Sequence, residues 1–189
     1  MLDKREDIIL KDLKDLIDGC MTRDRSSQRK MYDLFGSTMM GLCLRYCQNK
    51  EEAEEVLQDG FLQMFKNIGQ FQFRGSFEGW LRRIMINCAL QRYRGKLNHF
   101  RLVTLTDQDH FPSNDPDLND RLSEKELIER IQTLPPACRM VFNLHVFDGL
   151  KHREIAELLH ITEGTSKSNL SDARQILKRQ LKPELKIIR

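Results

Sequence analysis

A stretch near the end of the chain combines the residue types that bind nucleic-acid phosphates and base edges. Two short helical patterns, His152–Leu159 and a segment beginning at Glu163, are separated by a tight turn. At about 100° per residue, cations and short polar side chains share one side of the second pattern; they are Lys167, Ser168, Ser171, Arg174, Gln175 and Lys178. Lysine and arginine bind phosphates, and short polar side chains approach base edges in the major groove. The pattern predicts a helix-turn-helix that binds duplex DNA, over about Pro135 to Lys182.

The residues around this stretch are those needed to hold two crossing helices. Ala156 leaves room for the crossing, and Thr162 is placed to cap the second helix. His160 occupies the position where such turns usually have glycine, and histidine tolerates a positive φ. We expect direct contacts with the duplex from residues of both helices; they are His152, Arg153, Thr165, Ser166, Lys167, Ser168, Asn169, Ser171 and Arg174.

A second group of residues indicates binding to single-stranded nucleic acid. One face of a predicted helix, 77–94, carries an aromatic ring, two amides and two arginines, and an aromatic loop precedes it. Rings stack on bases, amides bond base edges and arginines hold phosphates. The predicted contacts are Phe71, Phe73, Arg74, Trp80, Arg83, Asn87, Gln91 and Arg94. An alternative remains open for the aromatic residues, especially Trp80, Phe61 and Phe65: they also suit a small hydrophobic core.

The apolar spacing predicts helices almost throughout, and no alternating run indicates a strand. We therefore expect an all-α protein of two small helical domains, 1–96 and 123–189, joined by a flexible, acidic linker, 97–122. The predicted helices span about 6–17, 24–47, 49–66, 77–94, 124–133, 136–146, 152–159 and 163–180. Gly19 is expected to end the first helix and Gly95 the fourth.

Composition excludes several classes of protein. The N-terminus is charged, and no apolar run is long enough to span a bilayer, so we expect a cytoplasmic protein without membrane insertion. The cysteines (Cys20, Cys43, Cys47, Cys88 and Cys138) are odd in number and scattered, which favours buried, reduced thiols over a metal site. No nucleophile has a predicted base, and no phosphate loop is present. We expect neither an enzyme nor a cofactor.

Charge is separated along the chain although the net charge is only +3. The segment from Arg82 to Lys96 has five basic residues and no acid, whereas the segment from Asp107 to Asp120 has five aspartates and no lysine or arginine. Such blocks favour charged partners over a uniformly solvated surface.

Three segments, in this order, resemble the extracytoplasmic-function (ECF) class of bacterial RNA polymerase sigma factors. They are Glu51–Phe65, Phe73–Leu81 followed by Asn87, and Leu134–Phe142 leading into the helix-turn-helix. The resemblance covers about Ile8 to Leu181. It implies two domains, sigma regions 2 and 4, which read the minus-10 and minus-35 promoter elements.

The resemblance also implies protein partners. The third predicted helix would bind the β′ clamp helices of core RNA polymerase through Glu54, Glu55, Gln58, Asp59 and Gln63, and region 4 would bind the β flap. An anti-sigma factor would hold the protein inactive, and the acidic linker would lie in the polymerase cleft. The main alternative is a two-domain regulator that binds duplex DNA alone; it accounts for the helix-turn-helix but not for the face carrying Trp80, Asn87 and Arg94.

Overall fold

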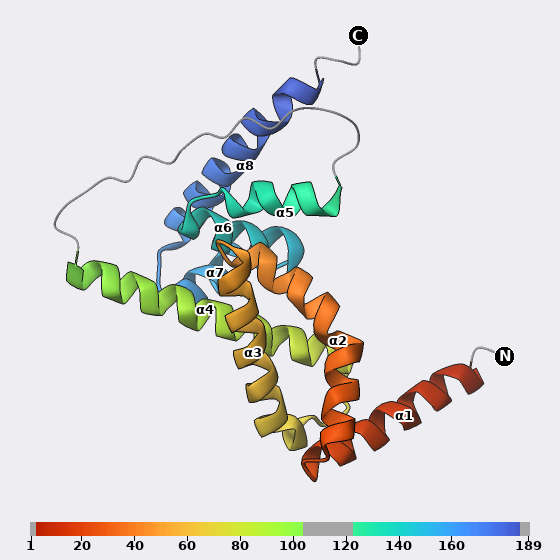
Figure 1. The fold of residues 1–189 in the computed structure, drawn as a ribbon. Helices are drawn as coiled ribbons and strands as arrows, with labels where there is room; N and C mark the ends of the chain where they lie inside the picture. The colour runs from red at the N-terminus through yellow and green to blue at the C-terminus, as the bar shows by residue number, and fades with distance from the viewer. Residues whose placement is uncertain (1–2, 104–122, 186–189) are drawn as a thin grey trace. The chain divides into compact units, whose positions relative to one another are not determined.

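The computed structural model describes residues 3–103 and 123–185. Within these ranges every regular element is a helix (Figure 1), which confirms the predicted all-α class. Contacts divide the chain into two compact units. The first comprises Met1–Cys43 and Lys50–Ala89, and the second comprises Leu44–Asn49 and Leu90–Arg189. The predicted domain limits differ from this division and stay a prediction.

The first unit is built from four long helices and one short turn. They are α1 (Asp3–Met21), α2 (Arg25–Tyr46), α3 (Lys50–Asn67), the 3₁₀ turn η1 (Ile68–Gln70) and α4 (Phe77–Val103), although the ends of α2 and α4 belong to the second unit. Their apolar faces meet in a core that includes Met31, Met39, Met64, Leu81 and Met85, none of them more than 1% exposed. This core fixes the outward faces of α3 and α4.

The start of α2 follows the sequence prediction. The Asp24 carboxylate accepts a hydrogen bond from the Ser27 backbone N–H at 2.7 Å and another from the Ser27 hydroxyl at 2.7 Å. These bonds lower the pKa of Asp24 below its usual value, because they stabilise the charged form. Gly19, however, lies inside α1, so the prediction that it ends the helix is wrong. A Cβ atom there would lie 2.2 Å from the Ser27 hydroxyl oxygen, which explains the need for glycine.

The predicted end of the fourth helix at Gly95 is also wrong. Helix α4 continues to Val103, so the first residues of the predicted linker, 97–103, are helical. Gly95 has ordinary helical backbone angles and open space around its Cα atom, and a single glycine costs a helix only about 1 kcal/mol relative to alanine. The rest of the linker, 104–122, lies outside the described residues.

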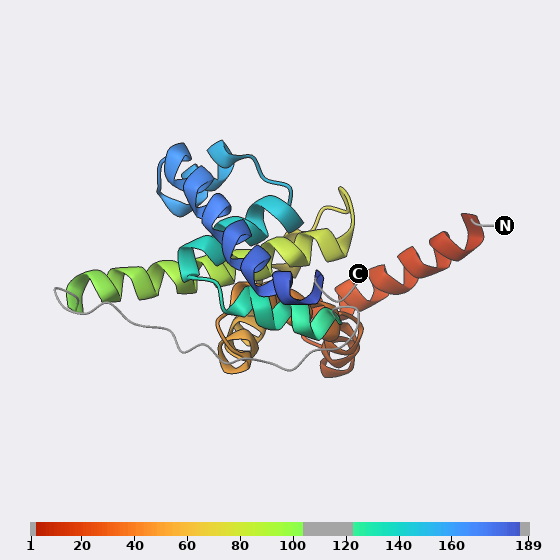
Figure 2. The ribbon, with the colours of Figure 1, turned by 90° about the horizontal axis from the view of Figure 1, so that it is seen from above.

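The second unit contains the predicted C-terminal helices. They are α5 (Glu124–Gln132), α6 (Pro136–Phe142), a π turn (Asn143–Phe147), α7 (His152–Leu159) and α8 (Glu163–Leu185). Helices α5, α6 and α7 each pack against α8, and two views show α5 alongside it (Figures 1 and 2). Leu134, Cys138, Ala173 and Leu177 form a buried cluster that joins α6 to α8. The polar side of α8 therefore faces away from this cluster.

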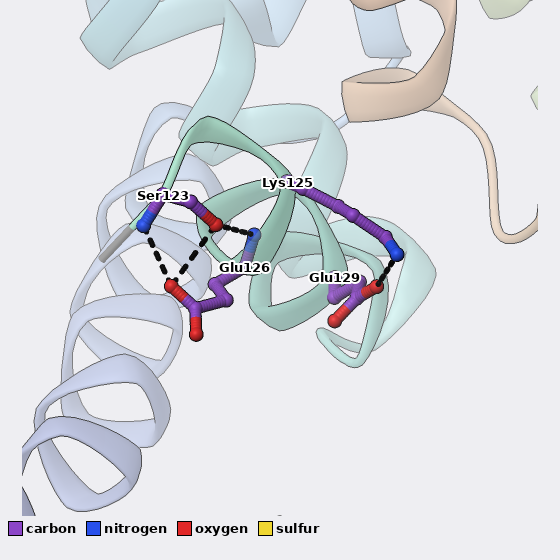
Figure 3. Close-up of polar contacts among 4 residues, drawn as sticks. All are labelled: Ser123, Lys125, Glu126 and Glu129. Carbon is purple, nitrogen blue, oxygen red and sulfur yellow. Dashed lines mark hydrogen bonds and ion pairs between the residues drawn. The ribbon is translucent and has the colours of Figure 1, made fainter. Parts of the chain in front are cut away.

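Local bonds fix where α5 begins (Figure 3). The Ser123 hydroxyl accepts a hydrogen bond from the Glu126 backbone N–H, and the Glu126 carboxylate accepts one from the Ser123 backbone N–H at 2.6 Å. This capping box satisfies two backbone donors that the helix cannot satisfy itself. The same bonds lower the pKa of Glu126. On the exposed surface of α5, Lys125 and Glu129 form an ion pair at 3.9 Å.

All five cysteines are buried and unbonded to one another, as predicted. Burial raises the pKa of Cys43 to about 12 and that of Cys20 and Cys88 to about 11. Thiols with such values are poor nucleophiles and poor metal ligands at neutral pH. In the part of the chain that the structure describes, no three histidine, cysteine or acidic side chains gather as metal ligands. Among the same residues, no helix has both the length and the apolar character needed to cross a membrane.

Candidate nucleic-acid interface

The turn between α7 and α8 has the geometry of a helix-turn-helix. His160 ends α7 with φ 54° and ψ 44°, the left-handed conformation that the sequence predicted for this position. The Ile161 backbone N–H donates to the Ala156 carbonyl at 3.1 Å, which closes the turn. The Thr162 hydroxyl oxygen accepts from the Thr165 N–H at 3.1 Å, so Thr162 caps α8 as predicted. These bonds fix where the polar face of α8 begins.

A groove of about 310 Å³ runs along the polar face of α8. Its lining includes one residue of α7 and several of α8: His152, Lys167, Leu170, Ser171, Arg174, Gln175 and Lys178. The side chains of Lys167, Ser168, Ser171 and Arg174 are exposed, as a surface that binds DNA requires. Gln175 and Lys178, which the helical spacing placed on the polar side of this helix, also line the groove, one turn beyond Ser171 and Arg174.

The structure corrects the prediction for Ser166. Its side chain is completely buried, so it does not reach a base edge. Instead its hydroxyl oxygen lies 2.9 Å from Nδ1 of His152, which is only partly buried. Asn169 is also partly buried, with its amide oxygen 3.9 Å from the Cys138 sulfur. Ser166 therefore positions another side chain and does not form part of the exposed face.

His145 is a residue of this region that the sequence did not single out. Its ring stacks on that of His152, with ring centres 4.6 Å apart and planes 13° from parallel. Its Nδ1 atom lies 2.9 Å from the Leu150 carbonyl oxygen. Because a carbonyl only accepts, that nitrogen carries the hydrogen. Burial, followed by the neighbouring His145 and Lys167, lowers the pKa of His152. His145 and His152 are seven residues apart and belong to different elements, so the spacing within one helix could not predict that their rings stack.

The loop before α4 forms a second pocket, within the first unit. It has a volume of about 380 Å³ and is lined by Gln70, Phe71, Gln72, Arg74, Gly75, Ser76, Gly79, Trp80 and Arg83. Five of the predicted single-strand residues, Phe71, Phe73, Arg74, Trp80 and Arg83, thus line this pocket or contact its lining. Gln70 and Gln72 were not predicted; their place beside the aromatic residues in the loop was the available signal.

The structure separates the aromatic side chains of the loop into buried and exposed rings. Phe71 is only 9% exposed. Its ring lies edge-on to that of Phe77, with ring centres 5.3 Å apart, and tilted against that of Trp80, with ring centres 5.6 Å apart, so Phe71 belongs mainly to the core. Phe73 is 47% exposed and lies 4.9 Å from Phe71. Its φ of 55° is rare for an aromatic residue. The loop therefore holds one ring in the core and presents the next to solvent.

The remaining predicted residues on α4 separate into two groups. Arg83 and Asn87 are exposed in the first unit, one helical turn apart. Gln91 and Arg94 follow on the same helix but belong to the second unit, so the structure does not bring them into the loop pocket.

The outward face of α3 is acidic. Glu54, Glu55, Gln58 and Asp59 are exposed, and Gln63 is half-buried. Leu62, which is not among the predicted polymerase contacts, lies on the same face and is 60% exposed. Carboxylates and amides around a single exposed leucine form a surface suited to a basic protein partner with an apolar centre.

Two family models match the chain in the order of its units. Sigma-70 region 2 matches residues 31–97, and Sigma-70, region 4, matches residues 124–177. The chain belongs to the ECF sigma factors. The matched parts of this sigma factor include α3, the aromatic loop, and α7 with most of α8.

Full-length relatives agree with this assignment. The chain is 28% identical over 179 residues to the RNA polymerase sigma-H factor of Pseudomonas aeruginosa, covering 87% of this chain and 93% of the relative. It is 29% identical over 170 residues to the ECF RNA polymerase sigma factor SigW of Bacillus subtilis, covering 84% and 91%. The sigma factor RpoE of Bartonella quintana, solved in complex with the anti-sigma factor NepR, is similar in fold, with a TM-score of 0.50 at 20% identity over 82% of this chain and 96% of that one.

Proposed function

We propose that this sigma factor, whose class directs promoter-specific transcription, reads duplex minus-35 DNA with α8 and the opened minus-10 strand with the loop before α4. The observation that carries the proposal is the presence of two chemically different sites on two units. One is a cationic groove along a recognition helix, and the other is a pocket lined by aromatic side chains and two arginines. Promoter recognition needs both kinds of site, because one element is read as a duplex and the other as separated strands.

The loop pocket is suited to a base that has left the double helix. Extruding a base costs a few kcal/mol, and stacking on aromatic rings offsets that cost. Phe73 and the half-buried Trp80 supply rings, Gln72 supplies an amide for a base edge, and Arg83 supplies a cation for the strand. Asn87, exposed one turn beyond Arg83, would contact the next part of the strand.

The cationic groove is suited to the backbone and base edges of a duplex. Arg174 and Lys178 offer charges to phosphates, while Ser171 and Gln175 offer hydrogen bonds to base edges. Thr165, Lys167 and Ser168 lie in the first turns of α8, the end that a recognition helix places deepest in the major groove. Arg153, exposed on α7 and paired with Glu157 at 3.4 Å, would approach the backbone.

Binding to core RNA polymerase is assigned to the acidic face of α3. Its exposed acceptors, Glu54, Glu55, Gln58 and Asp59, would meet the β′ clamp helices, and the second unit would meet the β flap. The assignment of these two partners, the β′ clamp helices and the β flap, rests on the resemblance to ECF sigma factors. An anti-sigma factor is the proposed inhibitor, because the RpoE protein of similar fold was solved in complex with one.

Transcription with purified components tests the proposal. The protein is expected to co-purify with core RNA polymerase and to direct transcription from promoters that core alone ignores. Start sites mapped after forced expression of the protein would share an upstream motif. If the cognate core polymerase, tested across many promoters, gains no initiation from this protein, the proposal is wrong.

Replacing Arg174 tests the duplex contact. Arg174→Ala is expected to weaken duplex binding and to make its dependence on salt shallower by about one phosphate contact. Arg179→Ala is the matched control, because Arg179 is also exposed but lies about 140° further around α8. Fluorescence anisotropy over a salt series measures both slopes. An unchanged slope in Arg174→Ala contradicts the assignment.

Replacing Asn87 tests the contact with the opened strand. Asn87→Ala is expected to leave polymerase binding intact and to reduce open-complex formation by about tenfold or less, the effect of one or two neutral hydrogen bonds. Glu78→Ala is the control, since Glu78 is exposed on the opposite side of α4, nine residues away. Permanganate reactivity of promoter thymines reports the opened strand, and normal reactivity in Asn87→Ala refutes the role.

A further inference from the structure

His152 is the one residue of α7 in the cationic groove, and it is held from two sides. The hydroxyl of the buried Ser166 contacts Nδ1 at 2.9 Å, and the ring of His145 stacks on its face at 4.6 Å. An exposed histidine ordinarily samples several rotamers, whereas these two contacts leave one orientation. The nitrogen on the far side of the ring, Nε2, is then the polar atom that His152 has left for a ligand.

The charges around His152 favour an anion in the groove. Lys167 and Arg174 on α8 are the cations that face it, and Glu163 on the same helix is the facing acid. Glu163 forms an ion pair with Lys167 at 2.8 Å, so those two charges largely cancel. On α7 itself, Arg153 pairs with Glu157, and the Glu154 carboxylate accepts the Lys151 N–H at 2.7 Å. Of the three charges on α8 that face His152, the charge of Arg174 is therefore the one that is not cancelled by its neighbour.

The hydrogen bond to Ser166 tolerates both charge states of His152. A hydroxyl donates to Nδ1 when the imidazole is neutral and accepts from Nδ1–H when it is protonated. The stack on His145 does not tolerate two charges, because cations at this separation repel each other. A charge on the His145 ring therefore disfavours the cation of His152.

We propose that the groove takes one backbone phosphate of the duplex between His152 and Arg174, and that His152 takes up a proton as this phosphate enters, so that duplex affinity rises as the pH falls. This inference rests on the proposed binding of duplex DNA by α8. His145 and Ser166 are positioning residues in it: neither touches the phosphate, and together they aim Nε2 at it.

The direction of the effect follows from proton linkage. In the free protein the pKa of His152 lies below its usual value, because burial, His145 and Lys167 disfavour the cation. A bound phosphate favours the cation and raises that pKa. Affinity therefore increases as pH falls through the pKa of the bound state, and it levels off below the pKa of the free state. Each unit by which the phosphate raises the pKa is worth about tenfold in affinity.

Anisotropy with the full chain and a short duplex of arbitrary sequence tests the inference, since phosphate contacts do not depend on sequence. At low salt, affinity of the native protein is expected to rise about threefold to tenfold between about pH 8 and about pH 5.5. His152→Asn keeps a partner for Ser166 but removes Nε2, and it is expected to lose most of this rise. His160→Asn is the matched control, because it removes an exposed histidine while asparagine accepts the left-handed backbone there; it should keep the rise.

A second variant separates positioning from general packing. His145→Phe retains a stacked ring but removes the neighbouring imidazole that lowers the pKa of His152, so the midpoint of the rise is expected to move to higher pH. If His152→Asn shows the same pH dependence as the native protein, or if His145→Phe leaves the midpoint unchanged, the inference is overturned while duplex binding stands. If the native protein binds no duplex at any pH, both the inference and the proposed role of α8 are overturned.

Discussion

Phe73→Gly is expected to lower the stability of the protein only modestly and to impair promoter opening strongly. Phe73 has a φ of 55°, a conformation that costs a residue with a Cβ atom about 1–2 kcal/mol. Glycine removes that cost, and its own loss of chain entropy on folding, about 0.5–1 kcal/mol, offsets most of the gain. Because the ring is 47% exposed, its removal costs about 1–2 kcal/mol of buried apolar area, less than the loss of a fully buried phenylalanine.

The loss of function comes from the missing ring. Stacking of a base on an aromatic side chain is worth about 1–3 kcal/mol, so opened promoter DNA should be held roughly fivefold to a hundredfold less tightly. Thermal unfolding followed by circular dichroism measures the change in stability, and permanganate reactivity in the polymerase complex measures promoter opening. Phe73→Tyr, which keeps the ring, is the matched control and should open promoters normally. Normal opening by Phe73→Gly would show that this ring does not hold the strand.

Met85→Ala is expected to lower the free energy of unfolding of the first unit by about 2–5 kcal/mol, the usual effect of truncating a buried methionine. Met85 on α4 is completely buried, and its sulfur lies only 2.1 Å from where a Cβ atom on Gly60 of α3 would stand. The two helices approach closely because glycine leaves this space to the methionine side chain.

A second substitution tests that account. In the Met85→Ala background, Gly60→Ala is expected to recover about 1 kcal/mol, because alanine favours the helix and enters the vacated space. In the native background the same change should be less favourable, since Met85 must move. Urea unfolding followed by the fluorescence of Trp80, the only tryptophan, reports on this unit. Met21→Ala, at a side chain 55% exposed, is the control and should stay within about 0.5 kcal/mol. Equal effects of Gly60→Ala in both backgrounds would contradict the proposed contact.

The sequence predicted the helices well because they are amphipathic and their caps are local. The predicted limits of α7 agree with the structure, Thr162 caps α8 where expected, and His160 takes the predicted backbone angles. The predictions at Gly19 and Gly95 are wrong for one reason: glycine was read as a helix end, although its effect depends on what lies nearby. At Gly19 a neighbouring side chain requires glycine inside the helix, and at Gly95 nothing opposes continuation.

The candidate sites were predicted only as far as helical faces allow. Spacing of 3.6 residues places Lys167, Ser171 and Arg174 on one side of α8, and the structure confirms that side chains at these positions are exposed. The expected contacts also included Ser166, although its spacing of four, seven and eleven residues from Leu170, Ala173 and Leu177 puts it on the apolar side of α8, where the structure buries it. What the helix alone does not show is the partner of a buried hydroxyl, which here is His152 on the preceding helix.

By itself the sequence determined the class of fold, the order of the helices, the family and the residue types of both candidate sites, because each of these depends on residues near one another in the chain. The tertiary structure alone decided which aromatic rings of the loop are buried, and that Ser166 and His145 orient His152. The helix-turn-helix is thus more than an exposed polar face: its first helix also supplies a fixed imidazole. Such facts depend on contacts between elements, where burial and hydrogen bonding across a crossing of helices select one orientation for each side chain.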